Sequence, residues 1–249
     1  DQFIYHELGR GAHVRTALHS VFERLDFSNE SKWDLTIQDA SKYYSNIIHG
    51  KNEEKNVESN LGYFRQLVDH VMRADININD ESFSLSEITS GKRLPELEFL
   101  FTVEQVNREE INKYLGEDAR LGGDSNIEGL MTGFIDLLFE HKGKYYILDW
   151  KSNHLGNGPE FYDREGMEQA MTGSNYHLQY MIYTVAAVRW LKTRIPDFDY
   201  DKHFGGVIYL FLRGIRQGKD TGIYTARPEK ETIEDLDKAL RGELQEADN

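Results

Sequence analysis

The chain has 249 residues, 39% of them hydrophobic, which is enough for one large or two small folded domains. It contains no cysteine, which excludes disulfides and thiolate metal sites and is compatible with a cytoplasmic address. The net charge of −14 argues against tight autonomous binding to nucleic acid, and the sequence contains neither an apolar run for a membrane span nor a signal peptide.

The first predicted element is a helix over residues 12–26. Apolar residues recur there at helical spacing, at Leu18, Phe22 and Leu25. His19 and Glu23 are four residues apart on a neighbouring face, although a lone helical histidine is usually structural or solvated. Residues 1–10 start abruptly and carry no targeting signal, as expected of a domain excised from a longer protein.

Residues 28–92 are predicted to form a helical insertion or cap beside a sheet, and no chemistry is evident in them. Two helices are expected in this segment, over 31–48 and 57–76. A polar loop at 49–56 separates them, and a second loop rich in Asn, Asp and Ser follows at 77–91.

The next predicted element is a strand at residues 95–101, where apolar and polar residues alternate. Glu96 and Glu98 share one face of this strand, and the ordinary interpretation is that both face solvent. A short helix at 107–116 and a loop at 118–127 follow.

The stretch 133–151 predicts an antiparallel hairpin, because two segments rich in Phe, Ile, Leu and Tyr flank a turn at 142–143. This turn would place Asp136 directly across from Asp149. Lys151 would share their face, because side chains alternate along a strand. Two carboxylates and an ammonium group are therefore expected to converge.

Two opposed carboxylates destabilise a strand pair, so a cation between Asp136 and Asp149 would resolve the conflict. Carboxylate oxygens are the ligands that Mg²⁺ prefers, and Lys151 would then lie beside a metal-bound water. This constellation is used to hydrolyse phosphodiesters. On spacing alone a second interpretation stays open, in which Asp136 ends a strand and Asp149 forms a surface ion pair with Lys151.

A polar loop at 152–164 precedes the longest predicted helix, at 166–194. Gln179 and Tyr183 are four residues apart on one flank of this helix, so an amide and a phenol could reach the same phosphate or base. By itself this spacing is frequent and gives no function.

Residues 204–212 form a continuous apolar run, which predicts a strand covered on both faces. Arg213 and Arg216 follow it and are expected to point toward DNA, with solvated loop arginines as the ordinary alternative. Residues 189–219 contain seven basic and three acidic side chains, whereas acidic side chains predominate in 51–120 and 221–249. Residues 229–246 predict an acidic helix that is either solvated or a docking surface for a partner subunit.

Four segments, in this order, resemble RecB-type nuclease domains of the PD-(D/E)XK, or restriction-endonuclease-like, superfamily. They are Gly133-Phe-Ile-Asp-Leu-Leu-Phe, Tyr145-Tyr-Ile-Leu-Asp-Trp-Lys-Ser-Asn, Leu178-Gln-Tyr-Met-Ile-Tyr-Thr and His203-Phe-Gly-Gly-Val-Ile-Tyr-Leu-Phe-Leu-Arg-Gly. The match is dense over 129–228 and thinner at 9–27, where Gly11 and Thr16 to Glu23 resemble the first helix of such nucleases, and at 94–102. Each piece alone is weak, but the combination is specific.

The resemblance implies an α/β fold with a mixed sheet flanked by helices, within a single domain over 1–249. Its core would be residues 94–225, with the helical insertion before it and an acidic C-terminal helix at 226–249. The resemblance assigns metal binding to His19, Asp136, Asp149 and the backbone carbonyl of Trp150, and action on the attacking water to Lys151. It also assigns substrate positioning to Gln179 and Tyr183, and makes Glu23 and Glu98 weaker candidates beside the metal. Mg²⁺ is the expected ion, and Mn²⁺ should substitute well because imidazole is an unusual ligand for Mg²⁺.

The implied function is that of a metal-dependent deoxyribonuclease of the exodeoxyribonuclease V type, acting in double-strand break repair. Single DNA strands would be delivered by a helicase portion of the same polypeptide and by partner subunits of a RecBCD-type complex. This chain itself contains no Walker A motif. Two alternatives stay open. One is a stand-alone RecB-like exonuclease, and the other is a non-enzymatic module that docks a RecA-type recombinase.

Overall fold

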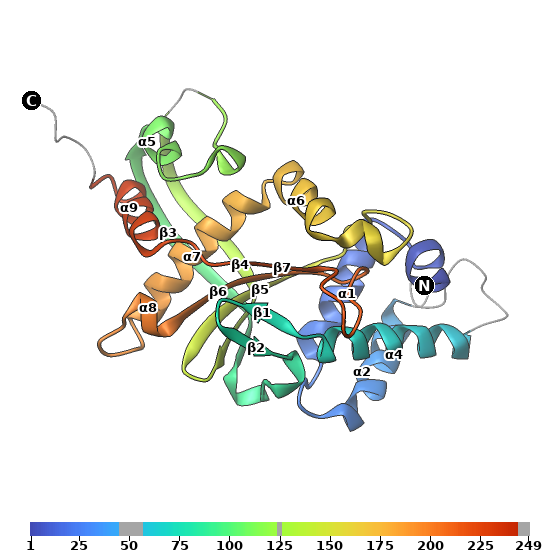
Figure 1. Ribbon diagram of the computed structural model, residues 1–249. Helices are drawn as coiled ribbons and strands as arrows, with labels where there is room; N and C mark the ends of the chain where they lie inside the picture. The colour runs from blue at the N-terminus through green and yellow to red at the C-terminus, as the bar shows by residue number, and fades with distance from the viewer. Residues whose placement is uncertain (45–56, 124–125, 244–249) are drawn as a thin grey trace, which may run out of the picture.

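The computed structural model describes residues 1–44, 57–123 and 126–243. In these ranges a five-stranded sheet with the order β3-β4-β5-β6-β7 forms the centre of the molecule (Figure 1). Its strands are β3 (Arg93–Val106), β4 (Ile127–His141), β5 (Lys144–Lys151), β6 (Phe204–Phe211) and β7 (Ile223–Ala226). Neighbouring strands are antiparallel except for β5 and β6, which are parallel. The predicted mixed α/β sheet is therefore confirmed.

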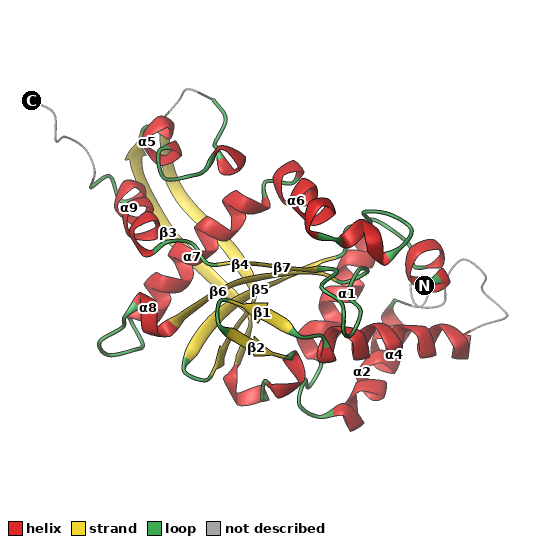
Figure 2. Cartoon of the chain, in the orientation of Figure 1, coloured by secondary structure: helices red, strands yellow, loops and turns green. Residues whose placement is uncertain are grey.

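Helices flank this sheet at several places (Figure 2). They are α1 (Ala12–Arg24), α2 (Trp33–Tyr43), α4 (Val57–Arg73), α5 (Arg108–Asn112), α6 (Arg164–Gly173), α7 (Tyr176–Lys192), α8 (Tyr200–His203) and α9 (Lys230–Leu240). Helix α1 packs on β5, where the rings of Phe22 and Trp150 stack at 4.9 Å. Helix α7 packs on β3, where Tyr183 meets the ring of Phe99 at 5.7 Å. No helix in the described ranges is long and apolar enough to cross a membrane.

The β4–β5 hairpin has the predicted turn and register. Lys142 and Gly143 both have positive φ, 48° and 83°, as a two-residue turn between twisted strands requires. Leu137 pairs with Leu148. The same register places position 136 across from position 149, as predicted.

The single helix predicted over 166–194 is wrong, because the structure contains two helices there. Helix α6 ends at Gly173, and α7 begins at Tyr176. Between them Asn175 has a φ of 55°, the left-handed conformation that asparagine tolerates better than most residues. Glycine lowers helix propensity just before this point. The break starts a new helix whose first turns carry Tyr176 and Gln179.

Short elements escaped prediction. The expected loop at 77–91 contains the hairpin of β1 (Ile76–Ile78) and β2 (Glu81–Phe83), and β7 was also missed. Strands of three or four residues are too short to display a convincing alternation. Single-turn helices were missed as well, at η1 (Phe3–Glu7), η2 (Glu30–Lys32), η3 (Leu85–Glu87), η4 (Ser90–Lys92), η5 (Glu117–Ala119) and η6 (Pro159–Tyr162).

The segment predicted as an insertion packs into the same apolar core as the sheet. Trp33 from α2, Phe64 from α4 and Phe83 from β2 belong to one continuous cluster of buried side chains with Phe22. The β1–β2 hairpin is also tied to the sheet, because Asn79 Nδ2 donates to the carbonyl of Gly205 at 3.1 Å. The predicted loop at 49–56 lies outside the described residues.

Candidate active site

Three predicted ligands converge where α1 approaches the middle of β4 and the C-terminal end of β5. The His19 ring reaches from α1, and its Nδ1 lies 3.5 Å from Oδ2 of Asp136. Asp136 and Asp149 are 9% and 2% exposed. The same Asp136 oxygen accepts the amide hydrogen of Trp150 at 2.8 Å, so a side chain joins the two strands where the regular ladder has ended.

A third acid reaches this group, and it is Glu96 rather than Glu98. Pro95 pairs with Leu137 and Leu97 with Ile135, so the intervening Glu96 lies across from Asp136. Glu96 has a φ of 49°, a conformation that costs free energy for a residue with a Cβ and that is concentrated at functional sites. Its pKa is raised by burial and by the charges of Glu23 and Asp149.

Both glutamates are exposed, but Glu98 pairs with Phe134 and does not lie across from Asp136. Alternation along the strand could not separate the two glutamates, because it places both on one face. The positive φ of Glu96, beside Pro95, is the local irregularity that brings Glu96 and not Glu98 to the acids.

The electrostatics of this group favour a bound cation. Burial, followed by the charge of Asp149, raises the pKa of Asp136 to about 8, although the Trp150 amide and Lys151 act in the opposite direction. Burial lowers the pKa of His19, so its ring is neutral near pH 7. Its Nε2 is buried and has no hydrogen-bond partner among the described residues. Repelling carboxylates with an imidazole nitrogen 3.5 Å from one of them fit a divalent metal ion well.

Lys151 lies on the other side of Asp149 and is 3% exposed. Its Nζ is 2.5 Å from Oδ1 of Asp149 and donates to Oε1 of Gln179 at 2.9 Å. The ammonium group also lies over the ring of Tyr176, 3.6 Å from its centroid. These contacts hold the lysine beside the acids in one orientation.

Gln179 and Tyr183 come together as the helical spacing predicts. The Gln179 Nε2 donates to the Tyr183 hydroxyl at 2.9 Å, and the Tyr209 hydroxyl donates to Gln179 Oε1 at 3.1 Å. Tyr176 and Tyr209 were missed by the sequence reasoning. Tyr176 lies three residues before Gln179 on the same helix, so helical spacing could have predicted that it is close to Gln179. Tyr209 lies in a strand that is apolar throughout, where no pattern distinguishes it.

Arg213 and Arg216 do not belong to this group, and the expectation that they point toward DNA does not hold for Arg213. Its side chain is 0% exposed and donates to the carbonyls of Ile4, Leu8, Gly9 and Ser152. Arg216 donates to the hydroxyl of Tyr5 at 2.8 Å and pairs with Asp1 at 2.5 Å. Both arginines therefore anchor the N-terminal segment, because a buried guanidinium needs several acceptors.

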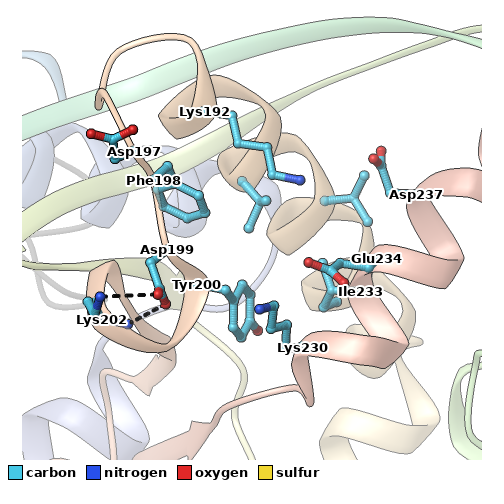
Figure 3. A pocket seen from close by; sticks show the side chains of 12 residues that line it. Lys192, Asp197, Phe198, Asp199, Tyr200, Lys202, Lys230, Ile233, Glu234 and Asp237 are labelled. Atoms are coloured by element: carbon cyan, nitrogen blue, oxygen red, sulfur yellow. Dashed lines mark hydrogen bonds and ion pairs between the residues drawn. The ribbon is translucent and has the colours of Figure 1, made fainter.

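A separate cavity of about 240 Å³ lies between α7, α8 and α9 (Figure 3). Val185, Val188 and Ile233 supply apolar surface, while Lys192 and Glu234 are among the charged residues that line it. None of the acids beside His19 lines this cavity. It offers a hollow next to α9, the helix in which a docking surface was predicted.

Comparison with known proteins gives one consistent result. Residues 12–249 match the family model of the PD-(D/E)XK nuclease superfamily. The RecBCD enzyme subunit RecB of Escherichia coli is 35% identical over 246 residues, and that of Haemophilus influenzae is 34% identical over 236. The RecB subunit of Borreliella burgdorferi is 27% identical over 250 residues.

These alignments cover 95%, 93% and 94% of this chain but only 20%, 18% and 20% of the three relatives. The chain therefore spans about a fifth of the length of the curated relatives that it matches.

Proposed function

The chain belongs to the PD-(D/E)XK nuclease superfamily, and from this premise we propose that it hydrolyses phosphodiester bonds of DNA with Mg²⁺ in a RecB-type enzyme. The observation that carries the proposal is the buried group of Asp136, Asp149 and Lys151 with the unpartnered nitrogen of His19. Opposed buried acids cost stability, and a bound cation removes that cost.

Asp136, Asp149 and His19 would hold the metal, with the backbone carbonyl of Trp150 as a further proposed ligand. A divalent ion bound there would polarise the phosphate and lower the pKa of an attacking water. Glu96 lies across from Asp136 and would add a third side-chain oxygen donor. Since imidazole suits Mn²⁺ better than Mg²⁺, Mn²⁺ should support activity as well.

Lys151 would orient the attacking water or stabilise the negative charge that develops on the phosphate. Its ammonium group is already placed, because Asp149, Gln179 and Tyr176 fix it from three directions. Such preorganised donors stabilise a transition state without reorganising during the reaction. Gln179 and Tyr183 lie side by side next to it and would position the strand.

The test is cleavage of a labelled single-stranded DNA with Mg²⁺ by the Lys151→Ala variant. We expect the rate to fall by at least about 100-fold, the usual cost of losing one group that stabilises the transition state. Lys144→Ala is the matched control, because Lys144 lies on the same strand and pairs with Glu81 at the surface. If the Lys151→Ala variant cleaved as fast as the control, the assignment of this site would be wrong.

The DNA strand would reach this site from a helicase portion of the same polypeptide and from RecBCD-type partner subunits, in the cytoplasm. Two observations support this part of the proposal. The chain carries a net charge of −14, and the side chain of Arg213 is fully buried. A surface with this charge gives a long-range repulsion for DNA, so affinity has to come from elsewhere.

Docking of a RecA-type recombinase is a second candidate function, favoured by the cavity beside α9. A docking role would survive Lys151→Ala, while Glu234→Lys would reverse a charge on the partly exposed lining of the cavity and weaken binding. Co-sedimentation of the two variants with recombinase filaments distinguishes the outcomes. Equal binding by wild type and the Glu234→Lys variant would exclude this surface.

A further inference from the structure

A second group of potential ligands lies apart from the catalytic acids. Asp118 in η5, Glu168 in α6 and His177 in α7 each offer one ligand atom, and these atoms lie within 4.8 Å of one another. None of the three contributes to the group around Asp136. Three separate elements of the chain therefore meet at this point.

The histidine of this group is buried and lacks a hydrogen bond at the nitrogen that faces the acids. His177 is 7% exposed. Its Nε2 lies 3.0 Å from Oε1 of Glu168 but makes no hydrogen bond within the described ranges. Its Nδ1 lies 3.4 Å from the hydroxyl of Tyr180. A histidine that binds metal usually donates its second ring N–H to an acceptor, and the oxygen of Tyr180 lies where it could accept that hydrogen.

The carboxylate of Glu168 is oriented by its own neighbours. Arg164 Nη2 lies 3.5 Å from Oε2 of Glu168, which leaves Oε1 for the side that faces His177. Outer contacts of this kind fix the direction of ligating carboxylates.

We propose that Asp118, Glu168 and His177 bind a Zn²⁺ ion, at a site distinct from the proposed catalytic centre. One imidazole and two carboxylates are ordinary zinc ligands, and water would complete the shell. Imidazole is an unusual ligand for Mg²⁺, so Zn²⁺ suits this group better.

Such an ion would join the η5 turn to the start of α7. His177 is the neighbour in sequence of Tyr176, whose ring lies under the ammonium group of Lys151. Zinc at His177 would thus stabilise the helical turn that holds the catalytic lysine. This inference goes beyond the nuclease proposal and does not depend on it.

The experiment measures binding of Zn²⁺ alone to the whole chain carrying Asp136→Asn and Asp149→Asn, which removes the catalytic metal site. Equilibrium dialysis should give one tightly bound equivalent, and Co²⁺ as a spectroscopic substitute should show absorption bands of a site with a nitrogen ligand. Adding His177→Gln or Asp118→Asn should weaken binding more than about 10-fold, since loss of even an outer contact typically costs that much. Glu165→Gln, one turn earlier on α6, is the matched control and should bind as before.

Two results would overturn the proposal. One is no tight Zn²⁺ in the background variant, and the other is equal affinity in the His177→Gln, Asp118→Asn and control variants. Asp118 is exposed, so its variant decides the matter even if His177→Gln fails to fold. Cleavage by the wild-type chain with Mg²⁺ is measured separately, so failure here leaves the nuclease proposal standing.

Discussion

Asp136 combines two functions that conflict without a metal. Its carboxylate accepts the Trp150 amide and joins two strands, yet it lies buried beside the charge of Asp149. The hydrogen bond favours the charged form, whereas burial and the second acid favour the neutral form. Burial wins, and the pKa rises from 3.8 to about 8.

The metal-free protein should therefore lose stability as pH rises. A carboxyl whose folded pKa lies above its unfolded value holds a proton in the folded state that the unfolded state has released, so stability falls between the two values. Between pH 6 and pH 8 in EDTA, we expect the free energy of unfolding to drop by about 1 to 3 kcal/mol. Urea titrations at each pH measure it.

Asp136→Asn is the control for this prediction, because its amide cannot ionise. The variant should show a smaller slope between pH 6 and pH 8 than the wild type. Excess Mn²⁺ should flatten the wild-type slope as well, since bound metal stabilises the charged form. Identical slopes in EDTA for the two proteins would exclude Asp136 as the source.

The two aspartates of the proposed site could be predicted from the sequence, but several residues beside them could not. Asp136 and Asp149 stood out because a strand pair does not tolerate opposed charges unless something compensates them. Glu96 joins them only because its backbone leaves the regular strand, which alternation cannot foresee. Tyr209 was hidden because one polar hydroxyl within an apolar run carries no pattern.

Among the elements, the exit of β6 is joined to the first residues of the chain. Arg213 donates from beneath the surface to carbonyls at both Ile4 and Leu8, at 2.6 and 3.1 Å. Those residues lead directly into α1, which carries His19. The arginine therefore connects a strand of the sheet with the helix that brings a proposed ligand.

Replacing Arg213 by Met should destabilise the fold. Several buried carbonyls would lose their donor at once, and buried acceptors without partners are costly. We expect the free energy of unfolding to fall by about 2 to 4 kcal/mol, measured by urea denaturation. Lys219→Met, at an exposed position nearby, should change it by less than about 0.5 kcal/mol. Equal losses in the two variants would contradict this structural role.

Long elements were predictable because each carried a repeated pattern. The β4–β5 hairpin combined two apolar segments with a turn of the right composition, and β6 was apolar throughout. The break between α6 and α7 was missed because the apolar spacing continues across it. The non-helical backbone of Ser174 and Asn175 interrupts the helix there.

For the molecule as a whole, the net charge disfavours DNA, whereas the proposed site is suited to it. The site suits a phosphodiester, while a net charge of −14 repels one. The net charge of the sequence correctly predicted this conflict. The expectation that Arg213 lies on the surface was wrong. Its burial follows from contacts with residues about two hundred positions away, which no local pattern reveals.

If weak capture of the strand limits this chain, tethering it to a separate DNA-binding module should lower its KM. We expect fusion through a flexible Gly/Ser linker to an OB-fold that binds single strands to lower KM for single-stranded DNA by at least about 10-fold. The reason is that a tethered strand reaches millimolar effective concentration. The turnover number should stay within about 2-fold, because the fusion leaves the groups around Asp149 unchanged. Steady-state kinetics at several salt concentrations measure both constants.

A fusion in which the aromatic residues of the OB-fold that stack on the bases are replaced by alanine is the control, and it should have the KM of the isolated chain. An unchanged KM in the active fusion would mean that the acidic surface does not limit capture of the strand.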